Sequence, residues 1–250
     1  MRIYSNKISE ENKKNKVGEK NITNQGFEIT LVEYKSYRDC IVEFNDRYHT
    51  RKSFSYLNFQ RGNIRNPSCW VLYKRGIAYR EDVKGNEKAF EKYRAMFDRC
   101  YGKQEGNNAV YKGCEVCNEW YDFSAFAKWY DENFYQINDE KMDLDKDLFG
   151  DGKLYSPNTC IFIPHKLNSQ FANHEKKNKT LSLPLGVTLH KREGGSVCYR
   201  VIALDKNQLF DSIDEASNAY NNYIHNNNVE FANKYKDIIP QKLYDFLMRA

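Results

Sequence analysis

The sequence predicts an α+β fold built from small modules, and three observations carry this prediction. Short segments rich in Ile, Val, Phe and Tyr alternate with turn residues near both ends of the chain, which is typical of antiparallel hairpins. Aromatic residues recur at three- and four-residue steps in the middle of the chain, which indicates amphipathic helices. The length of 250 residues suits one large domain or two to three small ones.

These changes of pattern divide the chain into four expected parts. We expect a flexible tail over residues 1–24, a β module over 25–83, a central domain over 84–180 and a C-terminal domain over 181–250. The tail is rich in Lys, Asn and Glu and has few apolar positions, so it has little to bury.

The composition excludes some classes of protein and leaves others open. No apolar run approaches the length of a transmembrane helix, and the N-terminus lacks the apolar core of a secretory signal, so we expect a cytosolic protein and no membrane partner. Neither a P-loop nor GxGxxG spacing is present, so no nucleotide cofactor is expected. The net charge of +5 and the 19 tyrosines suit a nucleic-acid surface, but also a chain whose tyrosines fill β-rich cores.

The N-terminal module is expected to consist of antiparallel hairpins. Its strands are "FEITLVEY" (27–34), "DCIVEFND" (39–46) and part of "FSYLNFQRGNIRNP" (54–67), which Gly and Pro punctuate. Its second half is rich in basic residues, which would form either a solvated face or a phosphate-binding edge. These residues are Arg47, Arg51, Lys52, Arg61 and Arg65.

Two helices are expected in the central region. Over 86–102 the apolar residues from Phe90 to Cys100 fall on one side. A second helix is expected to begin near Trp120, with Phe123, Phe126 and Tyr130 on one face. This aromatic stripe is more typical of a core than of a base-stacking platform.

The segment 142–174 is expected to form a ββα unit. "MDLDKDLF" (142–149) is a strand, "GDGK" (150–153) a turn, "TCIFIP" (159–164) a strand and "HKLNSQFANH" (165–174) a helix. Such a unit can hold one metal ion between a carboxylate of the first strand and an amide or imidazole of the helix.

Two residues of this unit have the right chemistry for the metal. Asp145 lies on the first strand and Asn168 on the helix, and oxygen ligands of this kind favour Mg²⁺, or Mn²⁺, over zinc. Asn158, between the strands, is the candidate for orienting a base. An ordinary charged β-turn is the competing interpretation of "LDKDLFGDGK".

Several residues could supply the base. Lys146 stands next to the first ligand, where a histidine would serve, and a lysine with a pKa of about 10.4 is protonated at neutral pH. Lys146 would then contact phosphate. Asp147 or His165 would supply the base, or a metal-bound hydroxide would need none.

Zinc is a second metal hypothesis. Cys114 and Cys117 have CxxC spacing, and Cys100 and Cys160 would complete four thiolates. There is a single CxxC pair, and the seven cysteines are equally compatible with buried thiols.

The C-terminal region is expected to be a three-stranded sheet followed by a helix. The strands lie within "GVTLHKR" (186–192), "SVCYRVIALD" (196–205) and "QLFDS" (208–212), and the helix covers 212–226 with a capping box from Ser212 to Glu215. A sheet of this size can enter the major groove of DNA, or its basic residues can form a solvated face. The DNA-binding candidates are Lys191, Arg192, Arg200 and Lys206.

Several of these segments resemble known families. "RAMFDRCY…YKGCEVCNEWYDFSAFAKWYDENFY…LDKDL…YSPNTCIFIPHKLNSQF", with the β module before it, resembles phage and prophage proteins related to HNH homing endonucleases. "GVTLHKR…YRVIAL…FDSIDEASNAYNNYI" is similar to the plant ethylene-response-factor (Apetala-type) DNA-binding domain. The likeness implies a ββα-metal unit with ligands at Asp145 and Asn168, and Lys146 where HNH relatives have histidine.

Three hypotheses follow. The first is a metal-dependent DNA endonuclease or nickase of phage type, acting in the cytoplasm of a bacterial host. The second is a DNA-binding protein that uses the same frame without catalysis, in phage regulation or counter-defence. The third is a protein-interaction module without a nucleic-acid partner.

Overall fold

The structure is a computed structural model that describes residues 15–174, 183–204 and 208–250, with the backbone alone for 107, 108 and 172–174. The chain forms two compact units. Unit 1 holds the described residues up to Glu132 together with Gly150–Thr159, and unit 2 holds Asn133–Phe149 and the described residues from Cys160 onward. The predicted central domain is therefore divided between the two units.

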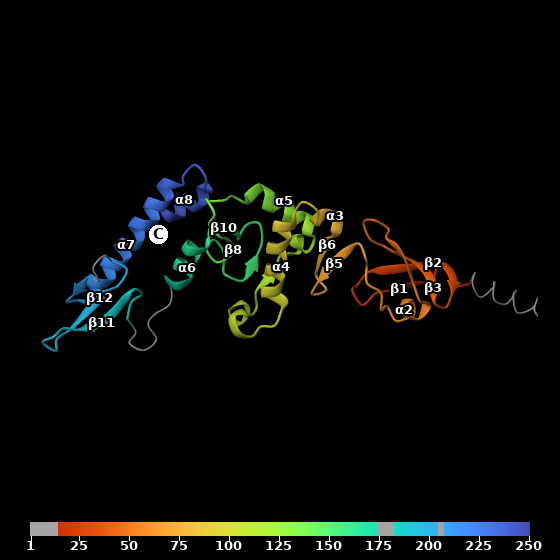
Figure 1. The fold of residues 1–250 in the computed structure, drawn as a ribbon, viewed down its shortest axis with the longest axis horizontal. Coiled ribbons are helices and arrows are strands. Elements are labelled where there is room, and N and C mark those ends of the chain that lie inside the picture. Colours follow the sequence, from red (N-terminus) through yellow and green to blue (C-terminus); the bar gives the residue numbers. More distant parts are fainter. Residues whose placement is uncertain (1–14, 175–182, 205–207) are drawn as a thin grey trace, which may run out of the picture. The chain divides into compact units, whose positions relative to one another are not determined.

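Unit 1 begins with a four-stranded antiparallel sheet in the order β1-β2-β3-β4 (Figure 1). Side chains alternate across the pleat, and one face buries Ile29, Leu31, Val42 and Phe44 completely. The strands and the helix that follows them are β1 (Lys20–Ile22), β2 (Glu28–Ser36), β3 (Asp39–Phe44), β4 (Arg51–Phe54) and α2 (Tyr56–Gln60). Strand β1 lies inside the predicted tail, because Lys20–Ile22 pairs with β2.

The remainder of unit 1 is an aromatic core between short elements. A side chain at Gly76 would collide with the rings of Tyr93 and Phe97, so the β5–β6 hairpin packs closely on α4. Trp120, Phe123 and Phe126 are fully buried, which confirms that the predicted stripe is core. The elements are β5 (Cys69–Leu72), β6 (Gly76–Tyr79), α3 (Arg80–Val83), α4 (Glu87–Tyr101), η1 (Gly106–Tyr111), β7 (Glu115–Val116), η2 (Asn118–Tyr121), α5 (Phe123–Asn133) and β9 (Leu154–Tyr155).

Unit 2 contains the ββα unit and two further helices. Strands β8 (Met142–Asp145) and β10 (Ile161–Pro164) pair antiparallel, and α6 (His165–His174) follows β10 directly. Ile161, Ile163 and Leu167 share a core with Leu243 and Leu247 of α8 (Gln241–Leu247). The predicted ββα unit is thus present as β8, β10 and α6, and apolar residues of α8 pack against it.

The C-terminal strands form the predicted three-stranded antiparallel sheet. They are β11 (Val187–Lys191), β12 (Val197–Val201) and β13 (Leu209–Phe210), with α7 (Ile213–Lys234) packed on one face (Figure 1). The hydroxyl of Ser212 accepts the backbone N–H of Asp214 and Glu215, as an N-cap should. Helix α7 runs past the predicted end at residue 226, because Phe231 and Ala232 extend its apolar face into the core shared with α8.

The predicted fold class is confirmed, and two further predicted boundaries are wrong. Trp120 belongs to the short 3-10 helix η2, and α5 begins at Phe123, where the Asp122 side chain accepts the N–H of Ser124. Strand β8 ends at Asp145 instead of continuing to residue 149. Within the described part of the chain, no helix combines the length and apolarity needed to cross a membrane.

Candidate functional site

The ββα unit places the first turn of α6 beside strand β8. The antiparallel register pairs Asp143 with Ile163 and Met142 with Pro164, so the helix starts where β8 starts. The backbone N–H of His165 donates to the carbonyl of Lys141 at 2.8 Å, which fixes this junction. Side chains on the first turn of α6 therefore reach the carboxylates of β8.

Asp143 is the carboxylate that the helix side chains contact. Its Oδ2 atom lies 2.6 Å from Nδ1 of His165 and accepts a hydrogen bond from Nδ2 of Asn168 at 3.3 Å. Nζ of Lys141 lies 3.8 Å from Oδ1. Burial of Asp143 opposes its ionisation, but the hydrogen bonds from His165 and Asn168 and the nearby positive charges outweigh burial and lower the pKa of this carboxyl. The three side chains form one connected group of carboxylate, imidazole and amide.

His165 is the exposed member of this group. The His165 side chain is 51% exposed to solvent, whereas that of Asp143 is 12% exposed. When Nδ1 donates its proton to the ionised carboxylate, Nε2 carries the lone pair on the solvent side of the ring. This arrangement of a carboxylate behind an imidazole orients a proton acceptor.

Asp145 is directed to the turn after β8. Its Oδ1 atom accepts the backbone N–H of Asp147 at 3.0 Å and of Leu148 at 2.8 Å. A side chain that satisfies N–H groups two and three residues ahead bends the backbone into a turn, and this is why β8 ends here. Burial raises the pKa of the Asp145 carboxyl and the charge of Asp147 adds to the rise, while the two N–H donors oppose it. The carboxylate is therefore held in place with its negative charge only partly compensated.

The structure differs from the sequence prediction in the partner of Asn168. The sequence paired Asn168 with Asp145, whereas the hydrogen bond of its amide in the structure goes to Asp143. Asp143 was missed, although a signal for it exists: it stands two residues before Asp145, and such residues lie on the same face of a strand. A metal at Asp145 and Asn168 stays a prediction.

Lys146, the residue at the position of the base, is buried and paired. Its side chain is 5% exposed, and Nζ lies 2.6 Å from Oδ1 of Asp147. An ammonium group in such an ion pair has no lone pair to accept a proton. The phosphate contact predicted for Lys146 requires the ion pair with Asp147 to open.

Asn158 lies in the turn between β9 and β10, which belongs to unit 1. This turn is tied locally: the hydroxyl of Thr159 donates to the carbonyl of Leu154 at 2.7 Å, and the N–H of Ser156 donates to the Thr159 hydroxyl at 3.1 Å. Because Asp145, His165 and Asn168 belong to unit 2, the orienting role of Asn158 stays a prediction.

The cysteines gain no support as a zinc site. Over residues 15–174, 183–204 and 208–250, no three or more His, Cys, Asp or Glu side chains are grouped so that they could hold a metal ion. Cys114 is buried with its Sγ 3.5 Å from the carbonyl of Gly152, and Cys117 is partly buried. Cys100 lies with them in unit 1, whereas Cys160 belongs to unit 2.

The C-terminal sheet presents one predicted arginine on the face opposite α7. Val187 and Val201 pack against α7, so the alternation of side chains places Arg200 on the other face, in register with Thr188 and Leu209. The Nε atom of Arg200 is buried without a hydrogen-bond partner among the described residues. Because this Nε is shielded from solvent, it is not itself accessible to a ligand in this conformation.

The other predicted DNA-binding residues differ from one another. Nη2 of Arg192 lies 2.7 Å from Oδ1 of Asp211, so its charge is compensated by an exposed ion pair. Lys191 is exposed at the end of β11. Lys206 lies outside the described residues.

Comparison with known proteins supplies no family assignment. No protein-family model matches the chain, nor does any curated protein or solved structure.

Proposed function

We propose that the protein binds DNA and cleaves it at the ββα unit, as a metal-dependent endonuclease or nickase of phage or mobile-element type acting in the cytoplasm of a bacterial host. The single observation that supports the enzymatic part is the group in which Asp143 contacts both His165 and Asn168. A carboxylate-backed imidazole and a helix amide within one ββα unit are the parts that phosphodiester hydrolysis requires.

The donor set of the unit fits a hard cation. The turn after β8 uses Oδ1 of the buried Asp145 carboxylate, so Oδ2 is left for a cation. The amide nitrogen of Asn168 is bonded to Asp143, so its amide oxygen is the second candidate ligand. Mg²⁺ in proteins commonly takes one or two carboxylates and completes its shell with water and substrate phosphate. The same oxygen donors accommodate Mn²⁺. We propose Asp145 and Asn168 as the holders of this ion, which when bound neutralises the charge on the scissile phosphate.

His165 is the residue that we assign to proton transfer. Asp143 fixes the ring through Nδ1, so Nε2 can take a proton from the attacking water. Asn168 holds Asp143 in turn. Lys146 takes no part as a base, because it is a buried ammonium paired with Asp147; it serves as a phosphate contact once DNA approaches. Asn158 is retained as an orienting residue.

The C-terminal sheet is the proposed recognition surface. Arg200 lies on the face of the sheet opposite α7, and an arginine in the major groove donates two hydrogen bonds to guanine. Lys191 and Arg192 at the edge of the sheet, with Lys206, would contact phosphates, which position a protein on DNA without reading sequence.

Incubation of supercoiled plasmid with the full chain tests the enzymatic proposal. We expect nicked or linear DNA with Mg²⁺ or Mn²⁺ and none with EDTA. Asp145→Ala and His165→Ala should each slow the conversion at least 100-fold, on the order that such groups contribute. Asp237→Ala removes an exposed carboxylate of unit 2 and should leave the rate unchanged. Equal cleavage by wild type and both site variants would contradict the assignment.

A second function is favoured by Lys146. Where HNH relatives have their histidine, this chain has a buried, ion-paired lysine, which fits a frame that binds DNA without cleaving it. This alternative predicts salt-sensitive DNA affinity that EDTA does not alter, together with intact plasmid under every metal.

A further inference from the structure

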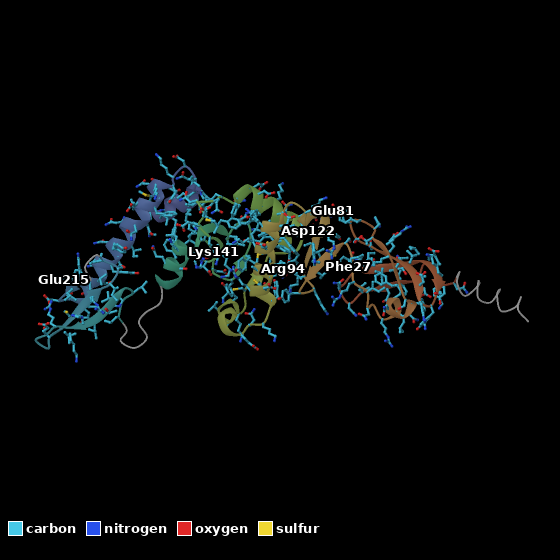
Figure 2. All side chains as sticks on the ribbon, viewed as in Figure 1. Phe27, Glu81, Arg94, Asp122, Lys141 and Glu215 are labelled. Atoms are coloured by element: carbon cyan, nitrogen blue, oxygen red, sulfur yellow. The ribbon has the colours of Figure 1, made fainter. Side chains whose placement is uncertain are left out.

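We infer that the tip of the β5–β6 hairpin in unit 1 is a second DNA contact, which holds backbone phosphates through Lys74 and Arg75 with Arg94 of α4 beside them. This inference rests on the proposed DNA binding and adds to it a surface that reads no sequence. The β5–β6 hairpin lies beside α4 in Figure 1, and Arg94 is labelled on α4 in Figure 2.

The backbone of the tip is held in a costly conformation. Tyr73 and Lys74 have φ angles of 51° and 57°, and the N–H of Arg75 donates to the carbonyl of Leu72 at 2.9 Å. A turn with two left-handed central residues is normally formed by Asn-Gly, because bulky side chains clash there. A Tyr-Lys pair keeps this turn at the expense of strain, and strain of this kind is typical of functional positions.

The guanidinium of Arg75 is fixed in one orientation. It lies over the ring of Tyr101 with 4.8 Å between Cζ and the ring centroid, and 6.0 Å from the centroid of Tyr121. Nη1 donates to the Tyr121 hydroxyl at 2.9 Å. A guanidinium has five N–H donors, so most remain for a ligand. An arginine fixed in advance loses less side-chain entropy when it binds a phosphate oxygen.

Three basic side chains near the tip outnumber two nearby carboxylates: Asp98, which accepts the Tyr73 hydroxyl, and Glu115, whose charge acts on Arg75. In unit 1, Arg47 is paired with Asp82 and Asp122, and Arg51 with Glu43. No ion pair to Lys74, Arg75 or Arg94 is present among the residues that the structure describes.

The tip is anchored to α4 next to Arg94. The hydroxyl of Tyr73 donates to Oδ1 of Asp98 at 2.7 Å, and this bond raises the pKa of Tyr73 while the charge of Arg94 acts in the opposite direction. Arg94 precedes Asp98 by four residues on α4, so the two side chains are neighbours on the helix face that Tyr73 contacts. Three cations and an aromatic support together match the chemistry of a phosphodiester backbone better than that of an acidic side chain, because several phosphates offer oxygens along one line.

The test uses the full chain, a fluorescent 20-base-pair duplex of mixed sequence, and KCl from 50 to 200 mM without divalent metal. The variant Lys74→Gln/Arg75→Gln should weaken binding and reduce the slope of log affinity against log salt by about 2, since each phosphate contact contributes about 0.9. Tyr121→Phe removes the hydroxyl that holds Arg75 but no charge, and should weaken binding less while leaving most of the slope.

Lys35→Gln/Arg38→Gln is the matched control, because it removes one exposed lysine and one exposed arginine from the β2–β3 hairpin of the same unit. Its slope should equal that of the wild type. Wild-type protein that binds no DNA would overturn the proposed function itself. Wild-type binding with an unchanged slope in Lys74→Gln/Arg75→Gln, or an equal loss in Lys35→Gln/Arg38→Gln, would overturn this inference alone. Tighter binding of the same sequence as duplex RNA would overturn the choice of DNA.

Discussion

Nδ1 of His165 lies 2.6 Å from Oδ2 of Asp143, and this contact joins the first turn of α6 to strand β8. Asn168, one turn further along the helix, donates to the same oxygen. The carboxylate thus orients one exposed imidazole and is itself held by an amide. The enzymatic proposal depends on this relationship more than on any single residue type.

Replacement of Asp143 tests whether it positions His165. Asp143→Asn keeps the size of the side chain but removes the charged acceptor, and we expect plasmid nicking to slow on the order of 100-fold, as for loss of a general-base contribution. Duplex affinity measured by anisotropy should stay within twofold of the wild type, because Asp143 contacts no proposed DNA-binding residue. A variant with the wild-type nicking rate would show that His165 acts without this partner.

The Asp46 carboxylate predicts a pH-dependent stability of the N-terminal module. It accepts five hydrogen bonds from four residues: Tyr48, Thr50, Asn66 and Ser68. Burial opposes ionisation of Asp46, but these bonds outweigh burial and lower the pKa of this carboxyl. The stabilisation is therefore present above the ordinary pKa of about 3.9 and is lost as the pH falls through the lower folded value.

Asp46→Asn should lower the free energy of unfolding by roughly 2 kcal/mol at pH 7, since one amide oxygen cannot replace both carboxylate oxygens. The gap between the two proteins should close as the pH falls below about 4. Urea unfolding at pH 7 and pH 3 measures both values, and a gap that is the same at the two pH values would contradict the role of the charge. Asp39→Asn, at an exposed carboxylate bonded to Ser53, is the control.

The hairpin tip predicts a trade-off between stability and binding. Lys74→Gly relieves a left-handed φ of 57° and removes a charge. We expect a gain on the order of 0.5 to 1 kcal/mol in unfolding free energy, after the greater entropy of glycine in the unfolded chain is subtracted. Duplex affinity should fall at the same time. Thermal unfolding and anisotropy on the same preparation decide the matter, and a variant that is less stable or binds equally well would contradict the account of the tip.

If Arg200 contacts guanine, its replacement should reduce the preference of the protein for its target sequence. Arg200→Gln should reduce the preference for a selected duplex over random duplex by about 1 to 3 kcal/mol, the usual contribution of a bidentate contact to guanine. Arg249→Gln, at an exposed arginine elsewhere in unit 2, should leave the preference unchanged. Affinities for both duplexes at one salt concentration provide the comparison, and an equal weakening on both would identify Arg200 as a phosphate contact instead.

Local pattern was sufficient to predict most elements of the fold. The alternation of apolar and polar residues in β2 and β3 and the apolar run of β10 ending at Pro164 were enough to place strands there and the start of α6 at His165. The length of α7 was underestimated, because Phe231 and Ala232 become an apolar face only when α8 packs on them.

Residues of the candidate site could be selected from the sequence, but the contacts between them could not. Sequence spacing identified Asn168 and His165, yet it could not show that Oδ1 of Asp145 is taken up by the turn after β8 while Asp143 contacts the helix. That choice depends on where β8 ends, which a local hydrogen bond decides. The division into two units was likewise not predictable from local pattern, because it assigns Asn158 to unit 1 and α6, which follows it in the sequence, to unit 2.

The most direct test of the central claim is where a cation binds the ββα unit when DNA is present. Isotope-labelled protein is mixed with a DNA duplex whose phosphates are replaced by uncleavable analogues. Mn²⁺ is then titrated while the amide NMR signals of the protein are recorded. We expect the signals of Asp145 and the side-chain amide of Asn168 to broaden first, and Asp145→Ala to abolish the effect. Broadening that is centred elsewhere, or that survives Asp145→Ala, would contradict this claim.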